Sequence, residues 1–282
     1  MKKKGSTILL ILIFIAGLAI LAYPTVSDWW NSFHSSRAIM SYAEAVSGLS
    51  EEEYGRLYAE AEAYNRRILE RSNPFLPSEE EKAEYESILN VESDGIMGYI
   101  EIPMINVSLP IYHGTTESVL QVAIGHVDWT SLPVGGESTH SVVSGHRGLP
   151  SAELFTKLDR LAVGDEFMLY VLNEVLTYEI DQILIVLPED VSALQISPGK
   201  DYCTLVTCTP YGINTHRILV RGHRVETEAV RSIRVTSEAI QVEPMLVAAV
   251  VAVPLFIVLL VVMFASDGRQ WDSKLENEEE SK

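Results

Sequence analysis

Cysteine and basic residues are both scarce in this chain. Its 282 residues include 2 cysteines, and 39 aspartates and glutamates outnumber 21 lysines and arginines, which gives a net charge of −18. Phosphate recognition needs clustered basic residues, so nucleic acid is excluded as an expected partner. The chain also lacks a glycine-rich phosphate loop, a Gly-x-Ser-x-Gly elbow and a Cys-x-x-Cys pair. No cofactor or metal is therefore expected.

An apolar run near the N-terminus predicts membrane association. Residues 7–23 are almost unbroken apolar sequence and follow three lysines at 2–4. This length lies at the short end of what crosses a bilayer, and the lysines favour a cytoplasmic N-terminus. The small residues of Gly17-Leu18-Ala19 leave open a cleaved secretory signal. Under either interpretation the middle of the chain is exported.

A second apolar run, residues 245–265, also has spanning length and is interrupted by Pro254. Its flanking basic residues are balanced, so the first span sets the orientation. Two spans place both termini in the cytoplasm and residues 24–243 outside the cell. Trp29 and Trp30 then lie just past the first span, where interfacial aromatic residues are common. The lipid bilayer is accordingly an expected partner.

The two cysteines occur within one apparent strand, Tyr202-Cys203-Thr204-Leu205-Val206-Thr207-Cys208. Residues five positions apart on a strand face opposite sides and lie about 16 Å apart. That separation exceeds the roughly 7 Å between Cα atoms that a disulfide tolerates. An exported protein thus carries two unpaired thiols, which indicates that at least one has a chemical role.

Helical patterns dominate the first part of the exported region. Residues 34–72 are predicted to be helical, with a capping box formed by Ser50 and Glu53. One apolar face recurs at helical spacing and predicts packing on the domain; it comprises Tyr54, Leu57, Ala61, Tyr64 and Ile68. Asn73-Pro74-Phe75-Leu76-Pro77 ends this helix, because proline disfavours a helical residue before it. Residues 78–90 form a solvated helix or a linker.

From about residue 95 the pattern changes to short strands separated by turn residues. Many short strands without regular helices between them favour a mainly β barrel or sandwich. Strands are predicted at residues 96–102, 107–111, 141–144, 166–171, 175–185, 202–208 and 216–224, with helical turns at 116–124 and 152–161.

The search for chemistry is a search for a base near a thiol, because an ordinary thiol is a weak nucleophile at neutral pH. His146 follows a predicted strand in the irregular Gly145-His146-Arg147-Gly148, where strands often deliver functional side chains. Loop hydrogen bonds alone could also explain this histidine. Cys208 is favoured over Cys203 because it ends its strand, whereas Cys203 has the position of a buried hydrophobe.

Arg217 lies on a strand that alternates, with Ile218 and Val220 on one face. If that aliphatic pair faces inward, Arg217 faces outward beside the strand of Cys208 and could stabilise a thiolate or an oxyanion. A surface salt bridge is the simpler explanation. A zinc site of Cys203, Cys208, His146 and His216 is a weak alternative, because strand spacing points the thiols apart.

These segments together resemble the sortase signature. It consists of Thr204-Leu205-Val206-Thr207-Cys208, Arg217 nine residues later in Asn214-Thr215-His216-Arg217, and the upstream Gly145-His146-Arg147-Gly148-Leu149-Pro150. The resemblance covers about residues 96–224. It implies Cys208 as the nucleophile, His146 as the general acid and base, and Arg217 as the group that stabilises the oxyanion or the substrate.

The match is most similar to class C, the pilus-polymerising sortases of Gram-positive bacteria. It depends on Thr209-Pro210-Tyr211-Gly212, Leu149-Pro150-Ser151-Ala152, the second span and the helical extension. The resemblance implies a closed eight-stranded β-barrel with N-terminal helices and two flanking transmembrane helices. It also implies cleavage of an LPxTG-like sorting signal through a thioester, and transfer to a lysine amine of a pilin subunit.

The resemblance also divides the chain into segments and exposes one departure. The expected parts are a cytoplasmic end and first span (1–23), a helical extension (24–90) with a lid-like segment (73–77), a catalytic barrel (91–228), a linker (229–244), the second span (245–265) and a charged cytoplasmic tail (266–282). Class C lids usually carry Asp-Pro-aromatic, but this chain has Asn73, Pro74 and Phe75. An amide cannot form the ion pair that a carboxylate makes with Arg217, so the resting lid is expected to be held less firmly.

Three other functions remain open from the sequence. A sortase that attaches proteins to peptidoglycan would use a cell-wall amine instead of a pilin lysine. A cysteine hydrolase would use water, and an added amine would not compete. A non-catalytic membrane-anchored surface protein would not need Cys208.

Overall fold

The computed structural model describes residues 2–71 and 77–227. The chain divides into two units, one of residues Met1–Thr25 with Ser232–Lys282, and one of Val26–Arg231. The predicted linker, second span and cytoplasmic tail lie outside the described residues, as do Asn73, Pro74 and Phe75 of the lid-like segment. The functional site lies in the second unit.

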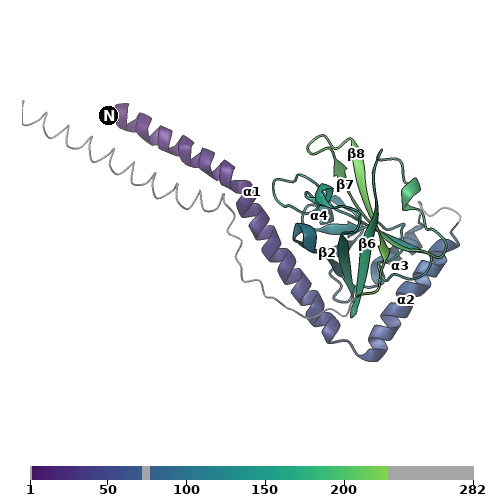
Figure 1. Ribbon diagram of the computed structural model, residues 1–282. Coiled ribbons are helices and arrows are strands. Elements are labelled where there is room, and N and C mark those ends of the chain that lie inside the picture. The colour runs from purple at the N-terminus through teal and green to yellow at the C-terminus, as the bar shows by residue number, and fades with distance from the viewer. Residues whose placement is uncertain (1, 72–76, 228–282) are drawn as a thin grey trace, which may run out of the picture. The chain divides into compact units, whose positions relative to one another are not determined.

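Three helices precede the sheet (Figure 1): α1 (Lys2–Ser47), α2 (Glu51–Leu69) and α3 (Glu79–Ser87). The helical structure predicted over residues 34–72 is present, and it is divided by a break after Ser47. Ser50 has an extended backbone and its side chain accepts a hydrogen bond from the Glu53 N–H, so it caps a new helix. The predicted capping box is confirmed, and it marks the start of α2.

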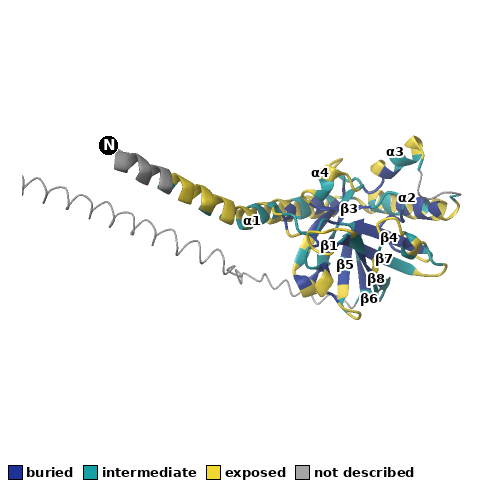
Figure 2. Cartoon of the chain, turned by 90° about the horizontal axis from the view of Figure 1, so that it is seen from above, coloured by how far each residue is buried: buried dark blue, intermediate teal, exposed yellow. Residues whose placement is uncertain are grey.

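Helix α1 carries the apolar run near the N-terminus. In the part of the chain that the structure describes, Ile11–Ser47 is the one stretch of helix long and apolar enough to cross a membrane by length and composition. Figure 2 shows the turns of α1 that follow its grey first turns as mostly exposed, and the exposed residues of this helix include Leu12, Ile15 and Ile20. Large exposed apolar side chains on a helix of this length support membrane anchoring.

The β-domain is a closed barrel, which confirms the predicted mainly β fold with eight strands. The strand order around the barrel is β1-β2-β3-β4-β7-β8-β6-β5. Most neighbouring pairs are antiparallel, whereas β2 with β3 and β4 with β7 are parallel. The strands are β1 (Ile96–Ile102), β2 (Val107–His113), β3 (Ile124–His126), β4 (Thr139–Ser144), β5 (Glu166–Val171), β6 (Glu174–Val186), β7 (Asp201–Thr209) and β8 (His216–Arg224).

The predicted and observed secondary structures differ most at strand β3 and at the two predicted helical turns. The first turn is the short helix α4 (Glu117–Leu120), and the second contains a 3-10 turn (Leu158–Arg160). The prediction assigned residue 124 to a helical turn, but it begins β3. A strand of three residues has no room to show an alternating pattern, and β3 exists because β2 and β4 pair with it from both sides.

The barrel interior is filled by alternate side chains of its strands. Figure 2 colours much of the strands as buried. On β7, Cys203 and Leu205 point into the main core, and on β8 Ile218 and Val220 do so. The intervening residues therefore face outward. The aliphatic pair of the last strand thus faces the interior, and Arg217 faces outward, as the sequence analysis expected under that condition.

Helices α2 and α3 pack on the barrel through buried residues that belong to the same core. Ala61, Tyr64 and Ile68 of α2 are buried there, as the predicted apolar face required. Tyr85 of α3 is also buried, and its hydroxyl lies 2.9 Å from Nδ1 of His126. The helical extension is thus part of one packed body with the strands.

His126 makes the fold sensitive to acid. Burial lowers the pKa of His126 to about 3, against a usual value of 6.5. Between these two pKa values the histidine is protonated in the unfolded chain and neutral in the folded chain. The free energy of unfolding therefore falls as the pH falls through this range. We expect the free energy of unfolding to drop by up to about 1.4 kcal/mol per pH unit from this group alone.

Urea unfolding curves at pH 7 and pH 5 measure this effect. The His126→Gln variant should start less stable at pH 7, because it disturbs the buried hydrogen bonds to Tyr85 and to the Ser131 carbonyl. It should nevertheless lose less stability on acidification than the unmodified protein. An equal loss in both proteins would show that other groups set the acid response.

Candidate active site

Strands β7 and β8 place Cys208 and Arg217 side by side. The two residues are direct partners in the antiparallel register of these strands. Cys208 is partly exposed and both of its strand neighbours, Thr207 and Thr209, are buried. Because side chains alternate along a strand, Cys208 and Arg217 project from the outer face of the barrel.

The guanidinium of Arg217 is oriented by the loop that precedes β8. Its Nη1 donates to the backbone carbonyl of Asn214 at 3.2 Å and to that of His216 at 3.1 Å. Both acceptors are neutral, so these bonds fix the direction of the side chain without cancelling its charge. An oriented cation beside a partly exposed thiol can stabilise a thiolate or an oxyanion.

His146 is brought to the other side of Cys208 by parallel pairing. The register of β4 with β7 ends with Ser144 opposite Val206. The pairing continues one residue further, because the Gly145 N–H donates to the Val206 carbonyl at 3.0 Å. His146 therefore follows at the level of Cys208. The structure brings together all three residues that the sequence singled out.

Thr207 ties the two strand ends together from inside the barrel. Its Oγ1 donates to the carbonyl of Gly145 at 2.7 Å, and the side chain is buried. The bond joins the residue before Cys208 to the residue before His146. It therefore fixes the spacing of the two catalytic candidates.

The Thr207→Val variant tests this role. Valine keeps the shape but leaves a buried carbonyl without its donor, which should lower the free energy of unfolding by about 1 to 2 kcal/mol. The catalytic rate should fall as well, because the spacing is no longer fixed. A matched Thr215→Val change in the exposed loop should alter neither quantity. A Thr207→Val protein with unchanged stability and rate would contradict this role.

Cys203 lacks the properties of a nucleophile. It is fully buried in the main core, and both cysteines are free thiols. Burial raises the pKa of the Cys203 thiol well above its usual value, and the nearby charge of Asp201 acts in the same direction. A protonated thiol inside the barrel is unreactive. The inward direction of Cys203 also rules out the zinc set that would combine it with Cys208.

Arg147 belongs to the site, but the sequence did not indicate a role for it. Its Nη1 donates to Oγ1 of Thr209 at 3.0 Å, and its Nη2 lies 2.5 Å from Oδ2 of Asp159. Its guanidinium also lies 6.0 Å from the centre of the Tyr211 ring. Arg147 thus connects the neighbour of His146 to the neighbour of Cys208. Its position directly after His146 was the one available signal.

Glu117 is the second residue that sequence reasoning missed. Its Oε2 lies 3.7 Å from Nε2 of His146. It belongs to α4, which lies between β2 and β3 in the chain, so nothing in the local sequence connects it with the histidine.

An apolar surface adjoins Cys208 on the outside of the barrel. Val206 lies two residues before Cys208 on the same face of β7 and packs against a cluster centred on Val142, Leu194 and Leu219. This cluster also includes Val127, Trp129, Leu184, Val186, Val191 and Ala193. An extended peptide with aliphatic side chains could lie on this surface and present a carbonyl to the thiol.

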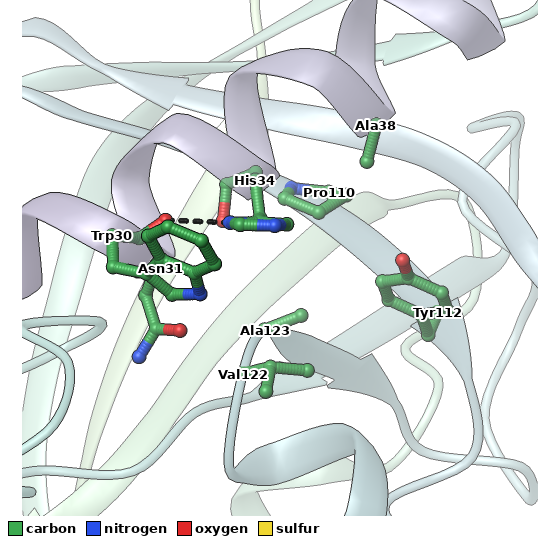
Figure 3. A pocket seen from close by; sticks show the side chains of 9 residues that line it. Trp30, Asn31, His34, Ala38, Pro110, Tyr112, Val122 and Ala123 are labelled. Atoms are coloured by element: carbon green, nitrogen blue, oxygen red, sulfur yellow. Dashed lines mark hydrogen bonds between the residues drawn. The ribbon is translucent and has the colours of Figure 1, made fainter. Parts of the chain in front are cut away.

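A separate pocket of about 330 Å³ lies between α1 and the barrel. Figure 3 shows Trp30 and His34 of α1 and Pro110 of β2 on one side of it, with Tyr112 of β2 and Val122 on the other. Nδ1 of His34 lies 2.8 Å from the Trp30 carbonyl. The lining includes neither Cys208, His146 nor Arg217, so the pocket is distinct from the candidate site.

Comparison with known proteins agrees with this geometry. The model of the sortase domain family matches residues 100–225, which contain the barrel except the start of β1, and all three candidate residues. A curated relative, sortase D of Bacillus subtilis, is 31% identical over 148 residues, or 51% of this chain and 72% of the relative. The chain belongs to the sortase family. It is accordingly a cysteine transpeptidase by family.

Several of the solved structures similar to this sortase are class C enzymes. Sortase C1 of Streptococcus agalactiae is 52% identical, with 68% of this chain and 100% of that chain covered and a TM-score of 0.67. Sortase C of Streptococcus pneumoniae is 44% identical, with coverage of 68% and 97% and a TM-score of 0.61. The latter structure is described in terms of catalysis and pilin substrate specificity. These matches confirm the resemblance to class C.

Proposed function

We propose that this sortase polymerises pilin subunits by cleaving an LPxTG-like sorting signal and joining it to a lysine amine. The observation that carries the proposal is the row of three groups across neighbouring strand ends. His146 follows β4, Cys208 ends β7, and Arg217 is its register partner on β8. This order supports a base on one side of the thiol and a cation on the other.

The first half of the reaction uses all three groups. The sulfur of Cys208 attacks the threonine carbonyl of the signal, and the oxyanion that forms is stabilised by Arg217. The peptide C–N bond then breaks, and His146 gives its proton to the departing glycine amine. The product is a thioester on Cys208, which keeps the acyl group activated for an amine.

The second half reverses these roles. A lysine amine attacks the thioester carbonyl, the C–S bond breaks, and the sulfur of Cys208 leaves. His146 accepts a proton from the incoming nitrogen. When the lysine belongs to another pilin, the product is an isopeptide-linked polymer. The similarity to sortase C of Streptococcus pneumoniae supports a pilin as the substrate.

Recognition of the signal is assigned to the apolar surface beside Cys208. Its aliphatic residues would pack against the leucine and proline of the signal, while the scissile bond reaches the thiol two residues beyond Val206. The exposed apolar helix near the N-terminus supports a membrane-anchored enzyme with its barrel outside the cell. In this proposal both termini of the chain lie in the cytoplasm.

A trapping experiment tests the function. The full-length protein in detergent is incubated with LPxTG-type peptides and a lysine-containing pilin peptide, and adducts are located by mass spectrometry. We expect a thioester on Cys208 and an amide to lysine. Transfer to a cell-wall cross-bridge amine in preference to the pilin lysine would support peptidoglycan anchoring. Release of free acid that added amine does not reduce would indicate a hydrolase.

A further inference from the structure

The carboxylate of Glu117 and the ring of His146 form a pair at the edge of the site. Nε2 of His146 is shielded from solvent and has no hydrogen-bond partner among the described residues. Oε2 of Glu117 lies 3.7 Å away, and the Glu117 side chain is 72% exposed against 28% for His146. A carboxylate open to solvent thus adjoins the shielded nitrogen that would exchange protons with substrate.

The carboxylate is held in this orientation by its own helix. Glu117 begins α4, and Nε2 of Gln121, one turn later, donates to its Oε1. One oxygen is therefore engaged by the protein, while Oε2 is directed at His146. A pre-oriented acceptor loses little entropy when it binds a donor.

The charges around Cys208 are arranged asymmetrically. The order of strands is β3, β4, β7 and β8, and α4 directly precedes and contacts β3. Glu117 therefore lies on the His146 side of the thiol, and Arg217 lies on the opposite side. Arg147 is neutralised by Asp159 at 2.5 Å. A cationic substrate group is attracted to the Glu117 side and repelled from the Arg217 side.

We propose that Glu117 binds the ammonium group of the acceptor lysine and delivers it to His146, an inference that rests on the proposed transpeptidase function. A lysine side chain is protonated at neutral pH and cannot attack until it loses a proton. The ammonium donates to Oε2 of Glu117, beside Nε2 of His146, which accepts one proton. The nitrogen then bonds to the thioester carbon, the C–S bond breaks, and the second proton leaves with the sulfur as the Cys208 thiol.

Two nucleophiles that differ in charge test this role. Lysine amines arrive as cations, whereas hydroxylamine is uncharged at neutral pH and gains nothing from a carboxylate. The full-length enzyme is first converted to the thioester with an LPxTG-type peptide. Its reaction with a lysine peptide or with hydroxylamine is then followed by mass spectrometry at several concentrations of each nucleophile.

Glu117→Gln should lower the ratio of the lysine rate constant to the hydroxylamine rate constant by at least about tenfold, the scale of one charge-assisted hydrogen bond. The loss should lie mainly in the KM for the lysine peptide. Glu117→Asp, which keeps the charge on a shorter side chain, should recover part of the ratio. Glu62→Gln removes the same charge from an exposed position on α2 and should leave the ratio unchanged.

The possible outcomes distinguish a failure of this inference from a failure of the proposed function on which it rests. Equal losses with both nucleophiles in Glu117→Gln would show that Glu117 only orients His146, and an unchanged ratio would show no role in acceptor binding. Either result overturns the inference while leaving a working transpeptidase. An unmodified enzyme that forms no thioester, or whose thioester reacts with neither nucleophile, would overturn both the proposed function and this inference.

Discussion

Replacing Cys208 with alanine is expected to abolish thioester formation and lower transpeptidation by at least about a thousandfold, because it removes the only described thiol on the outer face of the barrel. The side chain is partly exposed at a strand end, so its loss leaves no large cavity in the core. Stability should change little. The measurement combines single-turnover cleavage of an LPxTG-type peptide with thermal unfolding of the same protein.

Cys203→Ala is the matched control, since it removes the other thiol from the same strand. The inward position of Cys203 means that this change costs core packing and not chemistry. We expect lower stability by about 1 kcal/mol and most of the transpeptidation retained. A folded Cys203→Ala protein without activity, or an active Cys208→Ala protein, would overturn the assignment of the nucleophile.

Arg217→Lys is expected to lower kcat/KM for the sorting peptide by about a hundredfold or more, the scale of losing an oxyanion donor. Lysine keeps the positive charge but not the planar fork. The guanidinium is oriented by the Asn214 and His216 carbonyls and still has other N–H groups available for substrate. A single ammonium cannot reproduce both the anchoring bonds and the contact with the oxyanion.

Arg221→Lys provides the control on the same strand and the same face. Arg221 lies four residues further along β8 and pairs with both carboxylate oxygens of Asp181 at 2.9 and 3.0 Å. Its register partner is Thr204, away from Cys208. This variant should lose some stability and keep its activity. Near-normal turnover in Arg217→Lys would show that charge alone is sufficient and would refute a role for guanidinium geometry.

The sequence predicted those features that depend on local periodicity. Alternation along residues 216–224 put Ile218 and Val220 on one face and Arg217 on the other, and the barrel has them on opposite faces. The five-residue separation of Cys203 and Cys208 predicted opposite faces, and the two thiols are indeed free and differently buried. These features follow from the two-residue repeat of a β-strand. This repeat can be seen in the sequence of one strand, whichever strands pair with it.

The capping box of Ser50 and Glu53 was also predicted correctly, because it depends on residues three positions apart. The existence of β3 was not predicted. Strand β3 is too short to exist without its neighbours on both sides.

The sequence by itself predicted seven of the eight strands, the faces of their side chains and, through the family resemblance, Cys208, His146 and Arg217 as the catalytic candidates. Only the tertiary structure decided which other groups surround them. Arg147 contacts Thr209 across 62 positions of sequence, and Glu117 reaches His146 from a helix between two other strands. Such contacts arise from the parallel pairing of β4 with β7 and the closure of the barrel, which bring together segments with no shared local pattern.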